Sequence, residues 1–411
     1  MKIANLVKGS AALVMIAALA SCGSKSKKEY DLDNSKLIPV KTSDSKYGFM
    51  NKNGEIVMSD EFKHKPSAPV NGVFSVSNDD GEYTIYKLNG DKYDEFGSYG
   101  KVKGVGVLDE GLLVVAPKDK PMAVLDKNGD EKFIVEISGE EVLATGNRFS
   151  DGMLAVQQQT DGLWGYIDKN GEVIIKPAYD SAEPFLKGKA LVSKNEKDGN
   201  EYKTVYTVID KKGEPVLKVK DKYSNVYTSP VYDGLIVSSV DGDNTTWYLI
   251  DFKGEEKVKF PEKVQAIQDF DGKNIIYVND GLYGAMNLKG EDVVKPKYEE
   301  LAFDGSNFLA GKGEKGEVKS YVILKSNGEE TDKTFDTSHM EKVGKHGYFM
   351  KDGNTYIFVG DDGKEKNKGN EVKNFYVPSY HYDTISTDKK DKDGNSLSVK
   401  SSESNNAAGE E

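Results

Sequence analysis

Cys22 is the residue whose surroundings most clearly point to a chemical reaction. It is the only cysteine among 411 residues, so no second thiol is present to pair with it. Lys2 and Lys8 supply positive charge ahead of it, and residues 9–18 are apolar or small. This run is shorter than the roughly 20 apolar residues that span a bilayer, and its pattern is typical of a secretory signal peptide. We therefore predict export and cleavage near Cys22.

The residues Leu19-Ala20-Ser21-Cys22 define the cleavage point. They resemble the lipobox of bacterial lipoproteins, which implies cleavage between Ser21 and Cys22 and acylation of the cysteine; an ordinary signal peptide that happens to contain a cysteine is the alternative. Two or more acyl chains anchor a protein stably, at about 0.8 kcal/mol per buried CH₂. We predict a signal peptide over 1–21, followed by a lipidated cysteine and flexible tether over 22–36. The membrane is thus the first predicted partner.

Other residue sets that could perform chemistry are incomplete. The four histidines are scattered, and the sequence has no His-Glu-x-x-His, no Gly-x-Ser-x-Gly and no phosphate-binding glycine loop. Acidic turns such as 78–81 could bind calcium weakly, but solvated hairpin tips explain them better. Trp164 and Trp247 could stack on sugars, although their repeated positions favour core packing. We predict no catalytic residue, no metal site and no cofactor, and hence no enzyme.

Composition indicates an all-β protein that does not bind nucleic acid. The formal net charge is −12, which disfavours a polyanionic partner. Tyrosine (23 residues) and glycine (42 residues) are abundant, as expected for half-buried strands joined by many turns. Residues 386–411 are almost free of apolar side chains, which predicts a disordered polar tail.

An internal repeat occupies the chain between tether and tail. Each copy has an aromatic residue, alternating apolar residues, a polar turn ending in glycine, and a return strand; the clearest copy spans 164–177. The period is about 40 residues, which is typical of stacked or radial repeats. The turn glycines are Gly54, Gly90, Gly129, Gly171, Gly213, Gly254, Gly290, Gly328 and Gly363.

Each repeat is expected to fold into about four short strands, which is the composition of a β-propeller blade. We predict that 37–385 form a propeller-like ring of about 8–9 four-stranded units. An open β-solenoid with capped ends is the alternative. Nine hairpins exceed the usual blade number, so one terminal unit could be incomplete, or the first and last segments could share a blade.

Residues 162–180 resemble a WG-type β-repeat (Trp-Gly repeat), a family of repeat-built bacterial proteins without an established common chemistry. Residues 282–298 and 46–57 are similar to it, with tyrosine in place of tryptophan. The resemblance implies structural roles for the repeat residues and supplies no catalytic ones. These residues are Tyr47, Gly48, Gly54, Trp164, Gly165, Asp168, Gly171, Tyr179, Gly213, Trp247, Gly254, Tyr283, Gly284 and Gly290.

Anchor and repeats together predict a binding or scaffolding module in the bacterial cell envelope, with an envelope protein or polymer as partner. An envelope enzyme or carbohydrate-binding protein acting on glycan is the alternative. Gly23 is not the aspartate that resembles an inner-membrane retention signal, which favours the outer membrane. We predict a periplasm-facing protein, with the cell surface as the other location.

Overall fold

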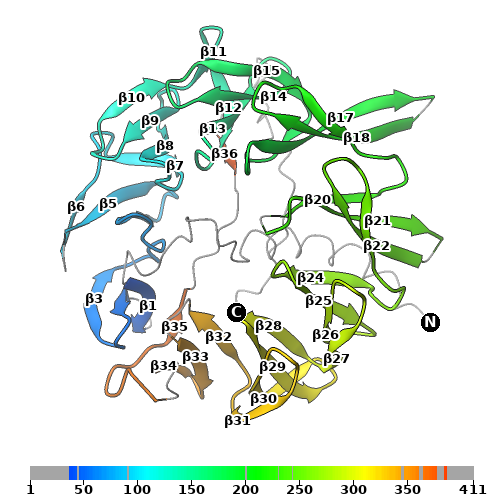
Figure 1. The fold of residues 1–411 in the computed structure, drawn as a ribbon. Coiled ribbons are helices and arrows are strands. Elements are labelled where there is room, and N and C mark those ends of the chain that lie inside the picture. Colours follow the sequence, from blue (N-terminus) through cyan, green and yellow to red (C-terminus); the bar gives the residue numbers. More distant parts are fainter. Residues whose placement is uncertain are drawn as a thin grey trace.

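The only regular secondary structure that the computed structural model describes is β-strand. The described residues are 37–43, 46–89, 92–199, 201–229, 231–242, 244–343, 347–360, 364–376 and 384–386. Their antiparallel sheets follow one another around a ring in chain order (Figure 1). Among these residues no helix has the length and apolar character needed to cross a bilayer. The predicted all-β class is confirmed.

The described strands form eight hydrogen-bonded sheets, and the seven-stranded sheet contains two blades that are joined where Tyr83 pairs with Val102, which gives nine blades. In each blade the first strand lies nearest the ring axis and the last at the rim (Figure 1). Blade 1 is β1 (Leu37–Ser43), β2 (Lys46–Asn51) and β3 (Ile56–Phe62), with β35 (Asn374–Phe375) on its inner side. Blade 2 is β4 (Val73–Ser77), β5 (Tyr83–Asn89) and β6 (Lys92–Glu95). Blade 3 is β7 (Lys101–Val105), β8 (Leu112–Pro117), β9 (Ala123–Asp126) and β10 (Glu131–Ile134).

Blades 4 to 6 continue the same order. Blade 4 is β12 (Glu140–Gly146), β13 (Met153–Gln158), β14 (Trp164–Asp168) and β15 (Val173–Tyr179), with β11 (Glu136–Ile137) and β36 (Thr384–Ser386) paired to β12. Blade 5 is β16 (Ser181–Ala182), β17 (Lys189–Asp198), β18 (Glu201–Asp210) and β19 (Pro215–Lys218). Blade 6 is β20 (Asn225–Thr228), β21 (Gly234–Asp241), β22 (Asn244–Asp251) and β23 (Glu256–Lys259).

The last three blades return the chain to its start. Blade 7 is β24 (Ala266–Phe270), β25 (Asn274–Asn279), β26 (Leu282–Asn287) and β27 (Asp292–Tyr298). Blade 8 is β28 (Glu300–Asp304), β29 (Asn307–Glu314), β30 (Glu317–Leu324) and β31 (Glu330–Phe335). Blade 9 is β32 (Met340–Val343), β33 (Gly347–Asp352) and β34 (Thr355–Gly360).

The hydrophobic core is divided among the interfaces between neighbouring blades, which we call seams and name by their blade numbers. Nine clusters of buried side chains occupy the nine seams, and one of them joins blade 9 to blade 1. A single sheet face cannot exclude water alone, so each blade depends on its neighbours. The structure is therefore a closed propeller, as predicted, and not an open solenoid.

The first and last segments of the ring share blade 1. Phe375 of β35 pairs with Val40 of β1, and its ring stacks on that of Phe349 in blade 9 at 4.1 Å between centroids. Asn370 Nδ2 also donates a hydrogen bond to the backbone oxygen of Gly54 at 3.3 Å. The sequence left open whether the first and last segments share a blade. The structure shows that they do.

The repeat turns are built as predicted. Asp168 Oδ1 accepts hydrogen bonds from the backbone N–H groups of Asn170 at 2.8 Å and Glu172 at 2.9 Å, and Gly171 adopts a φ of 85°. The same carboxylate or amide bonding recurs at Asn51, Asp126, Asp210, Asp251 and Asn287. The turn glycines Gly90 and Gly363 lie outside the described residues.

Candidate functional site

The lipidation and cleavage residues, Cys22 and Ser21, lie outside the described residues, as do 1–36 as a whole and 387–411. The predictions of a signal peptide, an acylated cysteine and a flexible tether therefore stay predictions. Ser386, the first residue of the predicted tail, belongs to β36.

The aromatic residues of the repeat are core residues. Trp164 is 7% exposed in seam 4/5, where Tyr179 packs against its cluster, and Trp247 is 4% exposed in seam 6/7. Tyr283 and Tyr47 are partly buried against the clusters of seams 7/8 and 1/2. Core packing, not sugar stacking, is thus the role of both tryptophans.

The glycine after the aromatic residue lets the rim strand approach closely. A Cβ on Gly165 would lie 2.4 Å from Ile175 O and 2.7 Å from Pro177 N. A Cβ on Gly284 would meet Val294 O and Pro296 N at 2.8 Å each. Gly48 takes the same place in β2, opposite Val40. The Trp-Gly pair therefore has a packing role. The aromatic ring is buried in a seam, and the glycine, which has no Cβ, allows the neighbouring strand to approach closely.

The turn glycines make a second kind of close contact, between blades. A Cβ on Gly171 would lie 2.9 Å from the Phe133 ring of the preceding blade, and one on Gly213 would lie 3.4 Å from Ile175. The Cβ at Gly254 would meet Leu217 at 3.0 Å, and that at Gly290 would meet Pro261 at 3.5 Å. None of the predicted repeat residues lines either of the two cavities described next.

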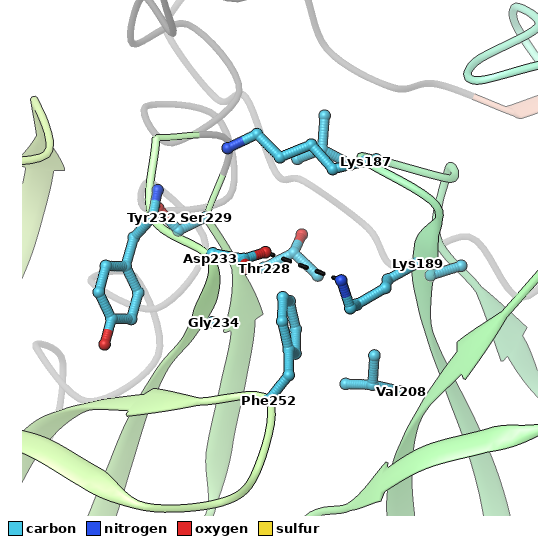
Figure 2. A pocket seen from close by; sticks show the side chains of 11 residues that line it. Lys187, Lys189, Val208, Thr228, Ser229, Tyr232, Asp233, Gly234 and Phe252 are labelled. Atoms are coloured by element: carbon cyan, nitrogen blue, oxygen red, sulfur yellow. Dashed lines mark hydrogen bonds and ion pairs between the residues drawn. The ribbon is translucent and has the colours of Figure 1, made fainter.

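Two seams, three blades apart, hold small cavities. In seam 5/6 the side chains of Lys187, Lys189, Thr228, Asp233 and Phe252 surround a space of only about 10 Å³. Figure 2 shows Lys189 reaching toward Asp233, with 3.8 Å between Nζ and Oδ1, and lying beside the Phe252 ring at 4.7 Å from its centroid. That volume accommodates at most a water molecule, so this cavity is closed to larger ligands.

Seam 8/9 holds the larger cavity, about 210 Å³ in volume. Its walls come from strands of both blades, and it includes apolar, cationic and acidic side chains. The residues that line it are Asp304, Asn307, Ile323, Lys333, Phe335, Lys342, Tyr348 and Gly360. We call it the seam 8/9 cavity and treat it as the candidate site.

Three polar side chains are held together at this cavity. Tyr348 O–H donates a hydrogen bond to Asp304 Oδ2 at 2.5 Å, and the Lys342 ammonium forms an ion pair with Asp304 Oδ1. Lys342 Nζ also lies 3.3 Å from Tyr348 Oη and 4.6 Å from the centre of the tyrosine ring. The Asp304 side chain is 9% exposed and that of Lys342 is 25% exposed. Each group orients the other two before any ligand arrives.

Lys–acid–Tyr trios also occur elsewhere, at positions that line neither of these two cavities. Tyr277 O–H donates to Asp292 Oδ1 at 2.7 Å, and Lys263 Nζ lies 2.8 Å from Asp292 Oδ2. Tyr223, Glu256 and Lys222 form a similar trio in seam 5/6. In both trios the lysine lies in the segment that leads into a blade and the carboxylate lies on the last strand of that same blade. The seam 8/9 trio differs because it lines a cavity. The cavity can therefore receive a small polar ligand group, with ammonium, carboxylate and aromatic surfaces already in place.

Glu183 is an acidic residue near the ring axis, apart from the seam 8/9 cavity. It follows β16 and lies between blades 5 and 6. Thr228 Oγ1 donates a hydrogen bond to Glu183 Oε2 at 2.7 Å, and Tyr166 O–H donates to the Glu183 backbone oxygen at 2.7 Å. Burial raises the pKa of Glu183 to about 7, although the Thr228 hydrogen bond opposes the shift. The same carboxylate adds to the burial that raises the pKa of Tyr227 to about 12. Glu183 thus titrates near neutral pH.

We expect Glu183→Gln to alter the pH dependence of stability. In the unfolded chain the carboxyl titrates near its ordinary value of about 4.3; in the folded chain its pKa is about 7. The folded state therefore holds an extra proton between these values, and the free energy of unfolding falls as pH rises through that window. At pH 8 the glutamine variant should be more stable than the wild type by about 1–2 kcal/mol, an amount reduced by partial solvent screening.

Urea unfolding of both proteins at pH 5 and pH 8 checks this expectation. Thr228→Val serves as the companion variant, because loss of its hydrogen bond should raise the Glu183 pKa further and steepen the decline toward pH 8. Equal pH profiles for wild type and Glu183→Gln would contradict it.

Blades 8 and 9 contribute a third polar cluster. Tyr321 O–H donates to Glu300 Oε2 at 2.5 Å. Burial and the nearby charge of Glu300 raise the pKa of Glu341, while burial lowers the pKa of His339. In the part of the chain that the structure describes, no three His, Cys, Asp or Glu side chains come together as potential metal ligands.

Sequence reasoning missed the seam 8/9 trio. Asp304, Lys342 and Tyr348 lie on three different strands of two blades, and none belongs to the repeat motif. Lys342 and Tyr348 are paired across the β32–β33 hairpin, and the packing of blade 8 on blade 9 adds Asp304. No spacing in the sequence could identify that third residue.

One protein family and several solved structures are similar to parts of this chain. Residues 164–197 match the family described as WG containing repeat. Similar solved structures include Sqt1 of Saccharomyces cerevisiae (11% identity, 74% of this chain and 92% of that chain, TM-score 0.34) and the C-terminal WD40 domain of Sif2 (12%, 75% and 93%, 0.37). Apo AztD from Citrobacter koseri is also similar (11%, 73% and 94%, 0.38). The sequence matches none of the curated proteins compared with it.

Proposed function

We propose that this protein is a binding module of the bacterial cell envelope, anchored to a membrane through acyl chains on Cys22. The observation that carries the binding role is the seam 8/9 cavity, where Asp304, Lys342 and Tyr348 are ordered beside an open space of about 210 Å³. That volume suits a side chain or a single small residue of a polymer, smaller than the roughly 300–1,000 Å³ of drug-sized sites. The partner is therefore a larger molecule that inserts one group.

Site-specific crosslinking tests the binding role. A photo-crosslinking residue is placed at Asn307, which lines the cavity, and in a control at Tyr202, which is 76% exposed on the β17–β18 hairpin. We expect one product from intact cells with the Asn307 probe only, and its loss in Lys342→Met. The matched control Lys263→Met removes a lysine from a trio without a cavity and should leave the product unchanged. The absence of any product at Asn307, or its persistence in Lys342→Met, would count against the proposal.

A glycan ligand is the second candidate, and the composition of the cavity favours it. Tyr348 and Phe335 offer aromatic surface, while Asp304 and Asn307 offer hydrogen-bonding groups of the kind that hydroxyls require. Titration of envelope polysaccharide fragments against wild type and Lys342→Met separates this candidate from a protein partner. Binding that depends on Lys342, without turnover of the fragment, supports a glycan-binding module; turnover would instead indicate an enzyme.

The location we propose is the outer membrane, with the ring facing the periplasm. Support comes from the lipobox-like residues 19–22 and from Gly23. Protease treatment of whole cells distinguishes the two faces: protection until the outer membrane is opened supports the periplasm, and digestion of intact cells indicates the cell surface. Metabolic labelling with a fatty acid, compared between wild type and Cys22→Ser, tests the anchor itself.

A further inference from the structure

Blade 4 carries two strands beyond the four of a complete blade, the short β11 and the C-terminal β36. Its strands β12 to β15 already form a complete blade, and the ring is closed elsewhere, by β35 in blade 1. β36 nevertheless pairs antiparallel with β12, with Ile385 opposite Thr145. In blades 5 to 8 no described strand is added to the innermost strand in this way. β36 thus has the geometry of a strand bound to a finished blade.

A matching pocket receives the central side chain of β36. Ile385 is 6% exposed and belongs to the cluster of seam 3/4. A Cβ on Gly104 would lie 2.6 Å from Ile385 Cγ2, and one on Gly106 would lie 3.2 Å from Ile385 Cδ1. At Gly106 the backbone alone excludes a side chain, because a Cβ there would lie 2.1 Å from Asn147 O. At Gly104 the next nearest atom to the Cβ position is the Ala116 methyl group, at 3.3 Å. Gly104 is therefore the residue that makes room for the guest side chain.

The β12 edge and the pocket over Gly104 contribute to peptide recognition in different ways. Backbone pairing with the edge of β12 holds any extended segment, independent of its sequence. The pocket over Gly104 selects the side chain in the middle of that segment, and its complementarity to Ile385 favours a β-branched apolar residue. The flanking residues Thr384 and Ser386 pair with Gly146 and Ala144.

We propose that the groove between β7 and β12 is a peptide-binding site for an extended segment with a central isoleucine or valine, and that Thr384–Ser386 of the same chain is its resident ligand. Release of this segment opens the groove to a peptide supplied in trans. The site is separate from the seam 8/9 cavity, so the two proposals can fail independently.

Binding of a labelled peptide to full-length variants tests the site. The probe is a fluorescent peptide of residues 381–389, and the variant Ile385→Glu removes the resident side chain. We expect the peptide to bind Ile385→Glu at least tenfold more tightly than the wild type, measured by fluorescence anisotropy. Ile174→Glu, a charge introduced at an isoleucine that is 41% exposed, should behave as the wild type does. A probe with glutamate at the isoleucine position should bind neither protein.

Hydrogen exchange provides a second readout that does not depend on the peptide. In the milder variant Ile385→Ala, the amides of 144–146 should exchange faster than in the wild type and regain protection when the peptide is added. Adding Gly104→Ala to either variant should abolish that recovery, because the new methyl group occupies the pocket. The proposal would be overturned if the amides of 144–146 exchanged at the same rate in Ile385→Ala as in the wild type. It would also be overturned if Gly104→Ala left peptide binding unchanged. A wild-type dimer that becomes monomeric in Ile385→Glu would overturn the assignment of a ligand from the same chain and indicate a second copy instead.

Discussion

Phe375→Ala should lower the free energy of unfolding by about 3–5 kcal/mol, the range for truncation of a buried phenylalanine. The Phe375 ring is 6% exposed, stacks on Phe349 at 4.1 Å between centroids, and meets the Tyr356 ring at 4.9 Å. It also sits on the two-residue strand that joins the end of the ring to β1. Its loss removes both a filled core position and the side chain that fixes the closing strand.

Urea unfolding followed by circular dichroism measures this loss. Tyr202→Ala is the matched aromatic truncation at a site that is 76% exposed, and it should change stability by less than about 0.5 kcal/mol. A cost below about 1 kcal/mol for Phe375→Ala would mean that β35 is not needed to hold the ring closed.

The repeating part of the fold could be predicted from sequence because each blade encodes its own hairpin. Asp168 and Gly171 specify a turn within a few residues, through a carboxylate that accepts two backbone hydrogen bonds and a glycine at positive φ. Seven of the nine predicted turn glycines lie among the described residues, each in a different blade and each with a positive φ. Local information of this kind needs no knowledge of the tertiary structure.

The residues that close the ring and those that form the cavities could not be predicted, because they meet only when the ring is complete. Phe375 lies in a two-residue strand with no repeat pattern around it. The role of Gly104 and Gly106 depends on their contact with Ile385, which is far along the chain. Lys342 and Tyr348 are paired within one hairpin, but Asp304 joins them only through the packing of blade 8 on blade 9.

The second large expected effect is at the turn glycine of the closing seam. Gly54→Ala should lower the free energy of unfolding by about 2–5 kcal/mol. Gly54 has a φ of 81°, and a Cβ there would lie 2.4 Å from the backbone carbon of Lys366 and 2.7 Å from the backbone nitrogen of Asn367. The left-handed conformation costs an alanine about 1–2 kcal/mol, and steric overlap with backbone atoms that cannot rotate away adds about 1–3 kcal/mol.

Gly111→Ala separates these two contributions. Gly111 has a nearly equal φ of 80°, but nothing lies within 4 Å of the position of its Cβ. This variant should show only the conformational cost of about 1–2 kcal/mol, and the difference between the two variants in urea unfolding reports the contact between blades 9 and 1. Equal losses of unfolding free energy in the two variants would mean that contact with blade 9 adds nothing to the effect at Gly54.

Combining Gly54→Ala with Phe375→Ala tests whether both residues belong to one closing unit. Gly54 contacts the segment 366–367, and Phe375 packs on blade 9 in the same seam. If one substitution already separates the blades, the second has less contact left to remove. The double variant should therefore lose less stability than the two single losses added together, by at least 1 kcal/mol. Pairing Gly111→Ala with Phe375→Ala should instead give additive losses, because Gly111 lies in blade 3; additivity in both pairs would show that the ring closes through two independent contacts.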